Sequence, residues 1–192
     1  MLSKKTQYAL QALSYMAGEK SDDPILIAKI AQEKNIPLKF LESIDNNVIT
    51  MHIDSPGGSV KSGLSMVNVM KVVKPKIKTV NTGMAASMGQ FILTAGAPGK
   101  RFATPHARIL MHQPLGGIGG TATDIRIQAE QMAATKKIMA EIIAKHTGQS
   151  VEQITIDSDR DNWFTADEAK EYGFVDQVVR SAGQVSGSGG TA

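Results

Sequence analysis

The chain has 192 residues, a length that suits one ordinary domain or a small module joined to a shortened one. Its net charge of +3 is a weak basic bias, which does not argue for a nucleic-acid partner. The absence of cysteine excludes disulfides, a thiol nucleophile and thiolate metal sites. No apolar run has the length of a signal peptide or of a membrane span, so we expect a soluble, cytoplasmic protein.

The first 44 residues are predicted to be helical. Apolar residues recur at helical spacing from Tyr8 onward, and this pattern ends at Gly18. A second short helix is expected over residues 27–33, and a third, which a proline precedes, over residues 38–44. Short turns separate these segments, which is typical of a helix-turn-helix unit.

After residue 47 the pattern changes to alternating strands and helices. Strands are expected at residues 48–53, 78–82, 100–104, 108–112 and 174–179. Helices are expected at residues 60–70, 87–95, 123–145 and 165–173. The alternation predicts an α/β core of mainly parallel strands covered by helices. Gly83 is expected to end the second of these strands, and the Ser- and Gly-rich residues 181–192 are expected to form a disordered tail.

Ser87 is a candidate nucleophile, because small residues surround it at a junction between a strand and a helix. Its hydroxyl would stand at a helix amino terminus, where free amides and the helix dipole favour developing negative charge. The segment is similar to the nucleophile elbow Gly-x-Ser-x-Gly, with Ala85 in place of the first glycine. The alternative is a serine that merely packs where a helix meets the sheet.

His112 is the candidate base, because it is a titratable residue at the carboxyl end of a predicted strand. The other histidines are weaker candidates, since one lies within a strand, one in a turn and one near the end of the long helix: His52, His106 and His146. The alternative for each of them is a surface or half-buried role.

Two further segments could complete such a site. The acidic run at residues 157–161, expected between two helices, offers three carboxylates that could orient a histidine: Asp157, Asp159 and Asp161. The pattern does not choose among them. The sequence Ser-Pro-Gly-Gly at residues 55–58 joins a strand to a helix, and its amides could form one wall of an oxyanion hole. The alternative for the acidic run is a solvated turn or a helix cap, and a structural turn explains residues 55–58 equally well.

These pieces, in this order, resemble the proteolytic subunit of the Clp protease. The matching segments are residues 53–58, 83–89, 96–101, 111–117, 146–149, 159–161 and 168–173. The likeness runs from about residue 48 to residue 179, and it implies a serine endopeptidase with the Clp protease/crotonase-like fold. It implies that Ser87 is the nucleophile, that His112 is the base and that Asp161 is the carboxylate that orients the base.

The same resemblance implies further roles. The amides of Gly58 and Met88 correspond to the oxyanion donors. Leu115 and Gly117 lie in the segment that corresponds to the edge where a peptide substrate binds as an added strand. The helix from Thr123 is similar to the handle through which two seven-membered rings stack, so self-assembly is expected. Unfolded proteins and peptides are the implied substrates, and neither a metal nor another cofactor is implied.

Residues 1–44 carry a second resemblance, to the amino terminus of winged-helix repressors of the iron–sulfur-cluster-regulator type. The segments that follow that pattern are residues 1–6, 8–10, 30–31 and 36–42. The predicted organisation is a truncated helix-turn-helix-like segment at 1–44, a Clp-protease-like core without its amino-terminal part at 45–180, and the tail at 181–192.

This organisation leaves two alternatives to a working peptidase. One is a DNA-binding regulator that uses the amino-terminal helices, and the other is an inactive chimeric fragment. The family's amino-terminal segments, which help to dock an AAA+ unfoldase, are predicted to be replaced here. The resemblance therefore argues against recruitment of that partner.

Overall fold

The computed structural model describes residues 27–37 and 48–180. The helix expected at residues 27–33 is confirmed, since α2 spans Ile27–Glu33. The two other helices expected before residue 45 and the expected tail at 181–192 lie outside the described residues.

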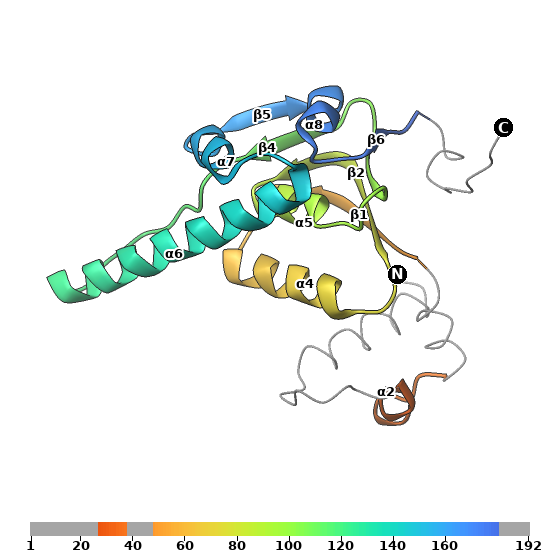
Figure 1. The fold of residues 1–192 in the computed structure, drawn as a ribbon. Coiled ribbons are helices and arrows are strands. Elements are labelled where there is room, and N and C mark those ends of the chain that lie inside the picture. The colour runs from red at the N-terminus through yellow and green to blue at the C-terminus, as the bar shows by residue number, and fades with distance from the viewer. Residues whose placement is uncertain (1–26, 38–47, 181–192) are drawn as a thin grey trace. The chain divides into compact units, whose positions relative to one another are not determined.

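The chain forms two compact units, of which the larger comprises residues 50–67 and 77–180 among those described. Its strands are β1 Ile49–Ser55, β2 Ile77–Ala86, β3 Arg101–Ala103, β4 Arg108–Met111, β5 Asn162–Thr165 and β6 Gln177–Val178. β2 runs parallel to both β3 and β4, and β3 runs parallel to β6. β5 is antiparallel to β4 at the end of the order β5-β4-β2-β3-β6, with β1 also paired to β2. The expected α/β fold of mainly parallel strands is therefore confirmed (Figure 1).

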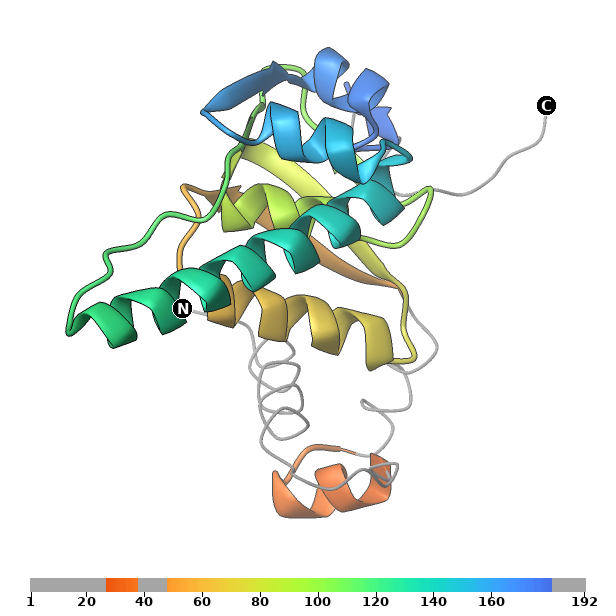
Figure 2. The ribbon, with the colours of Figure 1, turned by 60° about the vertical axis from the view of Figure 1, so that its left-hand side comes forward.

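The helices that follow β1 are α4 Val60–Val72, α5 Met88–Thr94, α6 Ala122–Thr147, α7 Val151–Asp157 and α8 Ala166–Tyr172. α5 is almost wholly buried in the core, whereas the first turns of α6 are exposed throughout. α6 passes alongside α5 and extends beyond the sheet, as Figures 1 and 2 both show. A capping box at Thr121 begins α6, and Gly148, with φ of 83°, ends it. Within the part of the chain that is described, no helix combines the length and apolar character needed to cross a membrane.

The prediction that Gly83 ends the second strand is wrong, because β2 continues beyond it to Ala86. The strand changes partner near this glycine, pairing first with β3 and then with β4. A Cβ at Gly83 would come within 2.7 Å of Oδ1 of Asp54, and the same oxygen accepts the amide of Met84 at 3.0 Å. The glycine therefore admits a carboxylate beside the strand, and the extended strand carries the chain to Ser87.

The region after α6 also differs from the prediction. The sequence pattern does not predict α7 or β5, so the acidic run lies between a helix and a strand, not between two helices. β6 is much shorter than the strand expected at 174–179. The reason is local: the amide of Phe174 donates back to the carbonyl of Ala169 at 2.8 Å and closes α8. Phe174 then packs into an aromatic cluster with Phe164 and Tyr172.

Arg101, in β3, is a buried arginine whose side chain donates hydrogen bonds to several elements. Its side chain, 9% exposed, donates from Nη2 to Oδ1 of Asp176 at 2.6 Å and from Nε to Oδ2 at 3.1 Å. Nη1 donates to the carbonyls of His146 and Gly173, which lie at the carboxyl ends of α6 and α8. Burial alone raises the pKa of Asp176, but the hydrogen bonds and charge of Arg101 outweigh it. The pKa therefore lies below its ordinary value of 3.8.

We predict that Arg101→Met lowers the free energy of unfolding of the larger unit by about 3 kcal/mol, because Asp176 stays partly buried without its cation. Urea unfolding at about pH 7 measures this change.

The folded pKa of Asp176 is depressed, so we predict a pH-dependent stability. The contribution of the Asp176 carboxylate is complete above the ordinary pKa of 3.8 and is lost as the pH falls through the folded pKa. Urea unfolding of the unmodified protein and of Asp176→Asn, from about pH 7 down to about pH 3, checks this sign. The stability difference between the two narrows with falling pH, and a difference that widens contradicts the prediction.

Candidate active site

The sheet brings the ends of three strands to one edge. β2 and β4 run parallel, so Ser87 and His112, which directly follow them, leave the sheet at the same edge. β5 runs in the opposite direction and pairs with β4, so Asp161, which directly precedes β5, lies at that edge too. The three candidate residues therefore stand at the ends of neighbouring strands.

Ser87 has an unusual backbone conformation, with φ of 55° and ψ of −119°. For a residue other than glycine, such a conformation costs on the order of 1–3 kcal/mol. The Ser87 amide still donates to the carbonyl of Leu110 at 2.9 Å, while the Ser87 carbonyl already accepts the amide of Phe91 at 3.1 Å. The chain thus passes from strand to helix at one residue. The hydroxyl makes no capping bond to the helix, which leaves it available for another role.

His112 and Asp161 are in contact. Nδ1 of His112 lies 3.1 Å from Oδ1 of Asp161, and their side chains are 14% and 64% exposed. This contact occupies Nδ1 and leaves Nε2 for a second partner. Among the hydrogen bonds of the described residues, none joins the Ser87 hydroxyl to the His112 ring. The structure therefore forms the histidine–carboxylate pair and brings Ser87 to the same edge without bonding it to the histidine.

The three carboxylates of the acidic run have different partners. Asp157 accepts the hydroxyl of Tyr172 at 2.6 Å, and burial together with this hydrogen bond raises the pKa of Tyr172. Asp159 accepts the side-chain amide of Gln113 at 3.2 Å. Of the three, Asp161 is the one that contacts His112, a distinction that the sequence pattern leaves open.

The loop at residues 55–58 packs directly on the turn at Ser87. Gly57 has φ of 105°, and a Cβ there would lie 2.7 Å from Cβ of Ser87 and 2.8 Å from the carbonyl oxygen of Ala86. The hydroxyl of Ser55 accepts the amide of Gly57 at 3.1 Å and fixes this bend. Only a glycine allows such a close approach, so the loop and the Ser87 turn form one unit.

A pocket of about 420 Å³ opens beside this loop. Gly58 and Met88, the two candidate oxyanion residues, both line it, so the structure brings them together. His52, a weaker histidine candidate, lines the same pocket. The apolar part of the lining comes from β1, α4 and α5: Met51, Ile53, Met66 and Ile92. An apolar pocket beside a few polar groups is the ordinary form of a site for a small ligand or a side chain.

Leu115 and Gly117 lie apart from this pocket, in the segment at residues 112–120 that continues from β4. The segment belongs to no strand, and its residues from Leu115 onward are exposed. Leu115 is 77% exposed, and a Cβ at Gly117 would meet no atom within 4 Å. The backbone there is open to an approaching chain.

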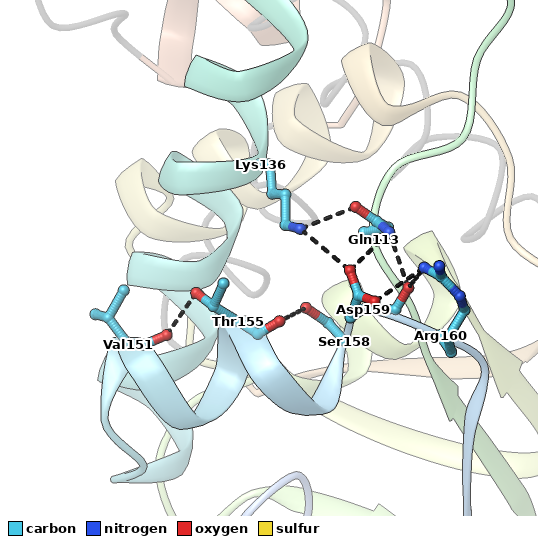
Figure 3. A network of polar contacts seen from close by, with 7 residues as sticks. All are labelled: Gln113, Lys136, Val151, Thr155, Ser158, Asp159 and Arg160. Atoms are coloured by element: carbon cyan, nitrogen blue, oxygen red, sulfur yellow. Dashed lines mark hydrogen bonds and ion pairs between the residues drawn. The ribbon is translucent and has the colours of Figure 1, made fainter.

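The sequence does not predict a polar network that lies beside the histidine–carboxylate pair. It joins Gln113, Lys136 and Asp159, with Arg160 at its margin, as Figure 3 shows. A lysine on the polar face of a long helix looks like any solvated charge, so Lys136 gives no signal in the sequence. The only available hint is the position of Gln113, directly after His112.

The chain is similar to several curated proteins. It is 62% identical over 141 residues to the ATP-dependent Clp protease proteolytic subunit 2 of Rhodococcus jostii (strain RHA1), across 73% of this chain and 72% of the relative. It is 56% identical over 166 residues to the ATP-dependent Clp protease proteolytic subunit 1 of Corynebacterium jeikeium (strain K411), across 86% of each chain. It is 49% identical over 174 residues to subunit 1 of Streptomyces coelicolor, across 91% of this chain and 77% of the relative.

The family model for Clp protease matches residues 12–182. This match includes most of residues 1–44, and the alignment that covers 91% of the chain reaches into them as well. The comparisons therefore give no support to the second resemblance, to winged-helix repressors. Since the family model matches most of the chain and the relatives share about half or more of the aligned residues, the chain belongs to the Clp protease family.

Proposed function

We propose that this chain is the proteolytic subunit of an ATP-dependent protease and that it hydrolyses peptide bonds through Ser87, His112 and Asp161. The observation that carries the proposal is the contact between His112 and Asp161 at the sheet edge where Ser87 makes its turn. The names of the relatives, which are proteolytic subunits of ATP-dependent Clp proteases, support the same function.

The mechanism is acyl transfer. Oγ of Ser87 attacks the carbonyl carbon of the scissile bond while Nε2 of His112 takes the hydroxyl proton. Asp161 holds the imidazole in the required tautomer and stabilises its protonated form. The amides of Gly58 and Met88 donate to the oxyanion of the tetrahedral intermediate. The imidazolium then gives its proton to the leaving amine, and water cleaves the acyl ester with His112 again as the base.

The substrates are unfolded proteins and peptides, bound mainly through their backbones. The exposed segment that holds Leu115 and Gly117 offers free backbone groups to an extended chain, which would bind as an added strand. The apolar pocket beside Gly58 would receive the side chain next to the scissile bond. Backbone recognition with one apolar pocket predicts broad sequence tolerance, since backbone hydrogen bonds ignore side chains.

The organisation of the protein follows from the same proposal. Residues 45–180 act as the peptidase core, and the cytoplasm stays the predicted location. The argument against an unfoldase partner rests in part on residues 1–44 being foreign to the family, and the match from residue 12 weakens that part. The relatives are named ATP-dependent, and we carry that dependence over to this chain.

We predict that Ser87→Ala abolishes labelling by a fluorophosphonate probe and that Asp161→Asn lowers peptide hydrolysis roughly 10⁴-fold, because the imidazole then loses its orienting carboxylate. Asp157→Asn is the matched control, since that carboxylate lies in the same run but contacts Tyr172. Its rate should stay close to that of the unmodified protein. If Ser87 is unlabelled in the assembled native protein, or if both Asp variants lose the same activity, the proposed site is wrong.

We predict that Gly57→Ala lowers peptide hydrolysis by about 10²-fold or more, because the displaced loop can no longer hold an oxyanion donor in place. The forced positive φ also costs about 1–3 kcal/mol in the free energy of unfolding. Gly99→Ala is the control, since Gly99 also has a positive φ, of 74°, but a Cβ there would meet no atom within 4 Å and the residue lies outside the candidate site. Peptidase assays with parallel urea unfolding measure both effects, and a fully active Gly57→Ala protein would contradict the role of the loop.

Self-assembly through α6 belongs to the same proposal. Three isoleucines on this helix are between 44% and 48% exposed: Ile125, Ile127 and Ile138. The resemblance to the Clp protease family implies that this helix is the handle between rings, and exposed apolar side chains along it are compatible with a contact surface. We therefore propose that α6 mediates association between copies of the chain.

We predict that the double variant Ile125→Asp/Ile127→Asp lowers the mass measured by light scattering, because association would bury two carboxylates without partners. Ile156→Asp on α7 is the control, since Ile156 is 69% exposed and lies outside α6. Association that survives the α6 change, or is lost equally in the control, would exclude α6 as the assembly surface.

A further inference from the structure

The contact between His112 and Asp161 needs support from its surroundings. Asp161 is 64% exposed, and an ion pair or hydrogen bond at such an exposed site contributes little stability by itself. Both residues also stand just outside their strands, where the pairing of β4 with β5 no longer holds them. Other contacts must therefore fix the distance between the two segments.

Gln113, directly after His112, supplies two such contacts. Its backbone N–H donates to the carbonyl oxygen of Ser158 at 2.6 Å. Its side-chain Nε2 donates to the carbonyl of Asp159 at 2.8 Å and to Oδ1 of Asp159 at 3.2 Å. The residue after His112 is thus tied to the turn that precedes Asp161, so the two segments move together.

Lys136 on α6 completes the network (Figure 3). Its Nζ donates to Oε1 of Gln113 at 2.9 Å and lies 3.9 Å from Oδ1 of Asp159. An ammonium group only donates and a carboxylate only accepts, so the Gln113 amide satisfies both with one orientation, its oxygen toward Lys136 and its nitrogen toward Asp159. The Lys136 side chain is 31% exposed, so water screens this contact less than it would a fully exposed pair.

We propose that Lys136 is a positioning residue for catalysis, which acts through Gln113 to hold His112 and Asp161 at hydrogen-bond distance. The inference rests on the proposed peptidase function. It assigns to α6 a task separate from the apolar association surface, because Lys136 reaches from the helix to the catalytic edge of the sheet of its own chain.

Arg160 does not fill this role. Its Nη1 contacts the carbonyl and Oδ2 of Asp159, the residue directly before it, so these contacts tie no separate elements together. Its side chain is also 84% exposed. Lys136 joins a helix, a strand end and a turn that lie far apart in the sequence.

The test compares Lys136→Met with Lys137→Met, the next residue on α6, which is exposed. Lys136→Met should lower kcat for a short peptide about 10- to 100-fold with little change in KM, because misplacing a catalytic group by a fraction of an ångström slows the chemical step. Lys136→Arg, which can still donate to Gln113, should restore most of the rate. Of the two methionine variants, Lys136→Met alone should show faster hydrogen exchange at the backbone amides of residues 112, 113 and 158–161.

A double-mutant cycle separates action through Gln113 from an independent effect. If Lys136 acts through Gln113, then Lys136→Met added to Gln113→Ala costs little more than Gln113→Ala alone. The inference is overturned if the losses of kcat in the two single variants multiply in the double variant. It is also overturned if kcat falls only because fewer assembled particles form, or if hydrogen exchange does not change. Hydrogen exchange tests the contact between the two segments even if the protein has no peptidase activity. An unmodified protein that neither labels at Ser87 nor cleaves peptides would sink the proposed function instead.

Discussion

The pairing of β4 with two neighbours of opposite direction is the constraint on which the site depends. β4 has only four residues, yet it is hydrogen-bonded to parallel β2 on one side and to antiparallel β5 on the other. Parallel pairing brings the end of β2 beside the end of β4, and antiparallel pairing brings the start of β5 to the same place. A shift of register by one residue in either pair would turn a candidate side chain of the site to the other face of the sheet.

Two cations, one buried and one partly exposed, illustrate how polar groups serve a largely apolar fold. Arg101 is nearly buried and satisfies four acceptors, including two carbonyl groups at helix ends that would otherwise lack donors. Lys136 is partly exposed and has two partners. The first contributes to the stability of the fold, and we infer that the second contributes to the geometry of the site.

Much of this fold could be predicted from the sequence, because alternating apolar runs and turn residues mark the elements between Ile49 and Thr147. Local chemistry also fixes some ends of helices, as the capping box at Thr165 does for α8. The two errors have different causes. Asp54, which lies 30 residues before Met84, allows β2 to pass through Gly83, and no local pattern contains that information. The shortening of β6 is local, because a bond from Phe174 back to Ala169 closes α8.

The candidate site shows the same division. The neighbourhood of Ser87 predicts a turn from strand to helix, and the structure has that turn. The carboxylate that faces His112 cannot be chosen locally, because Asp157, Asp159 and Asp161 are equivalent until strand pairing gives each a different partner. The resemblance to the Clp protease family names Asp161, and the contact with His112 agrees with that assignment. Lys136 is invisible for a similar reason, since its partner lies more than twenty residues away.

The backbone at Ser87 limits which residues evolution can place there. At a φ of 55° a β-branched side chain is strongly disfavoured, because its second branch crowds the backbone. Threonine carries the same hydroxyl group, yet it would have to pay that steric cost at the point where the chain leaves β2. The geometry of the turn therefore favours serine over threonine on steric grounds alone, independently of the chemistry of the hydroxyl.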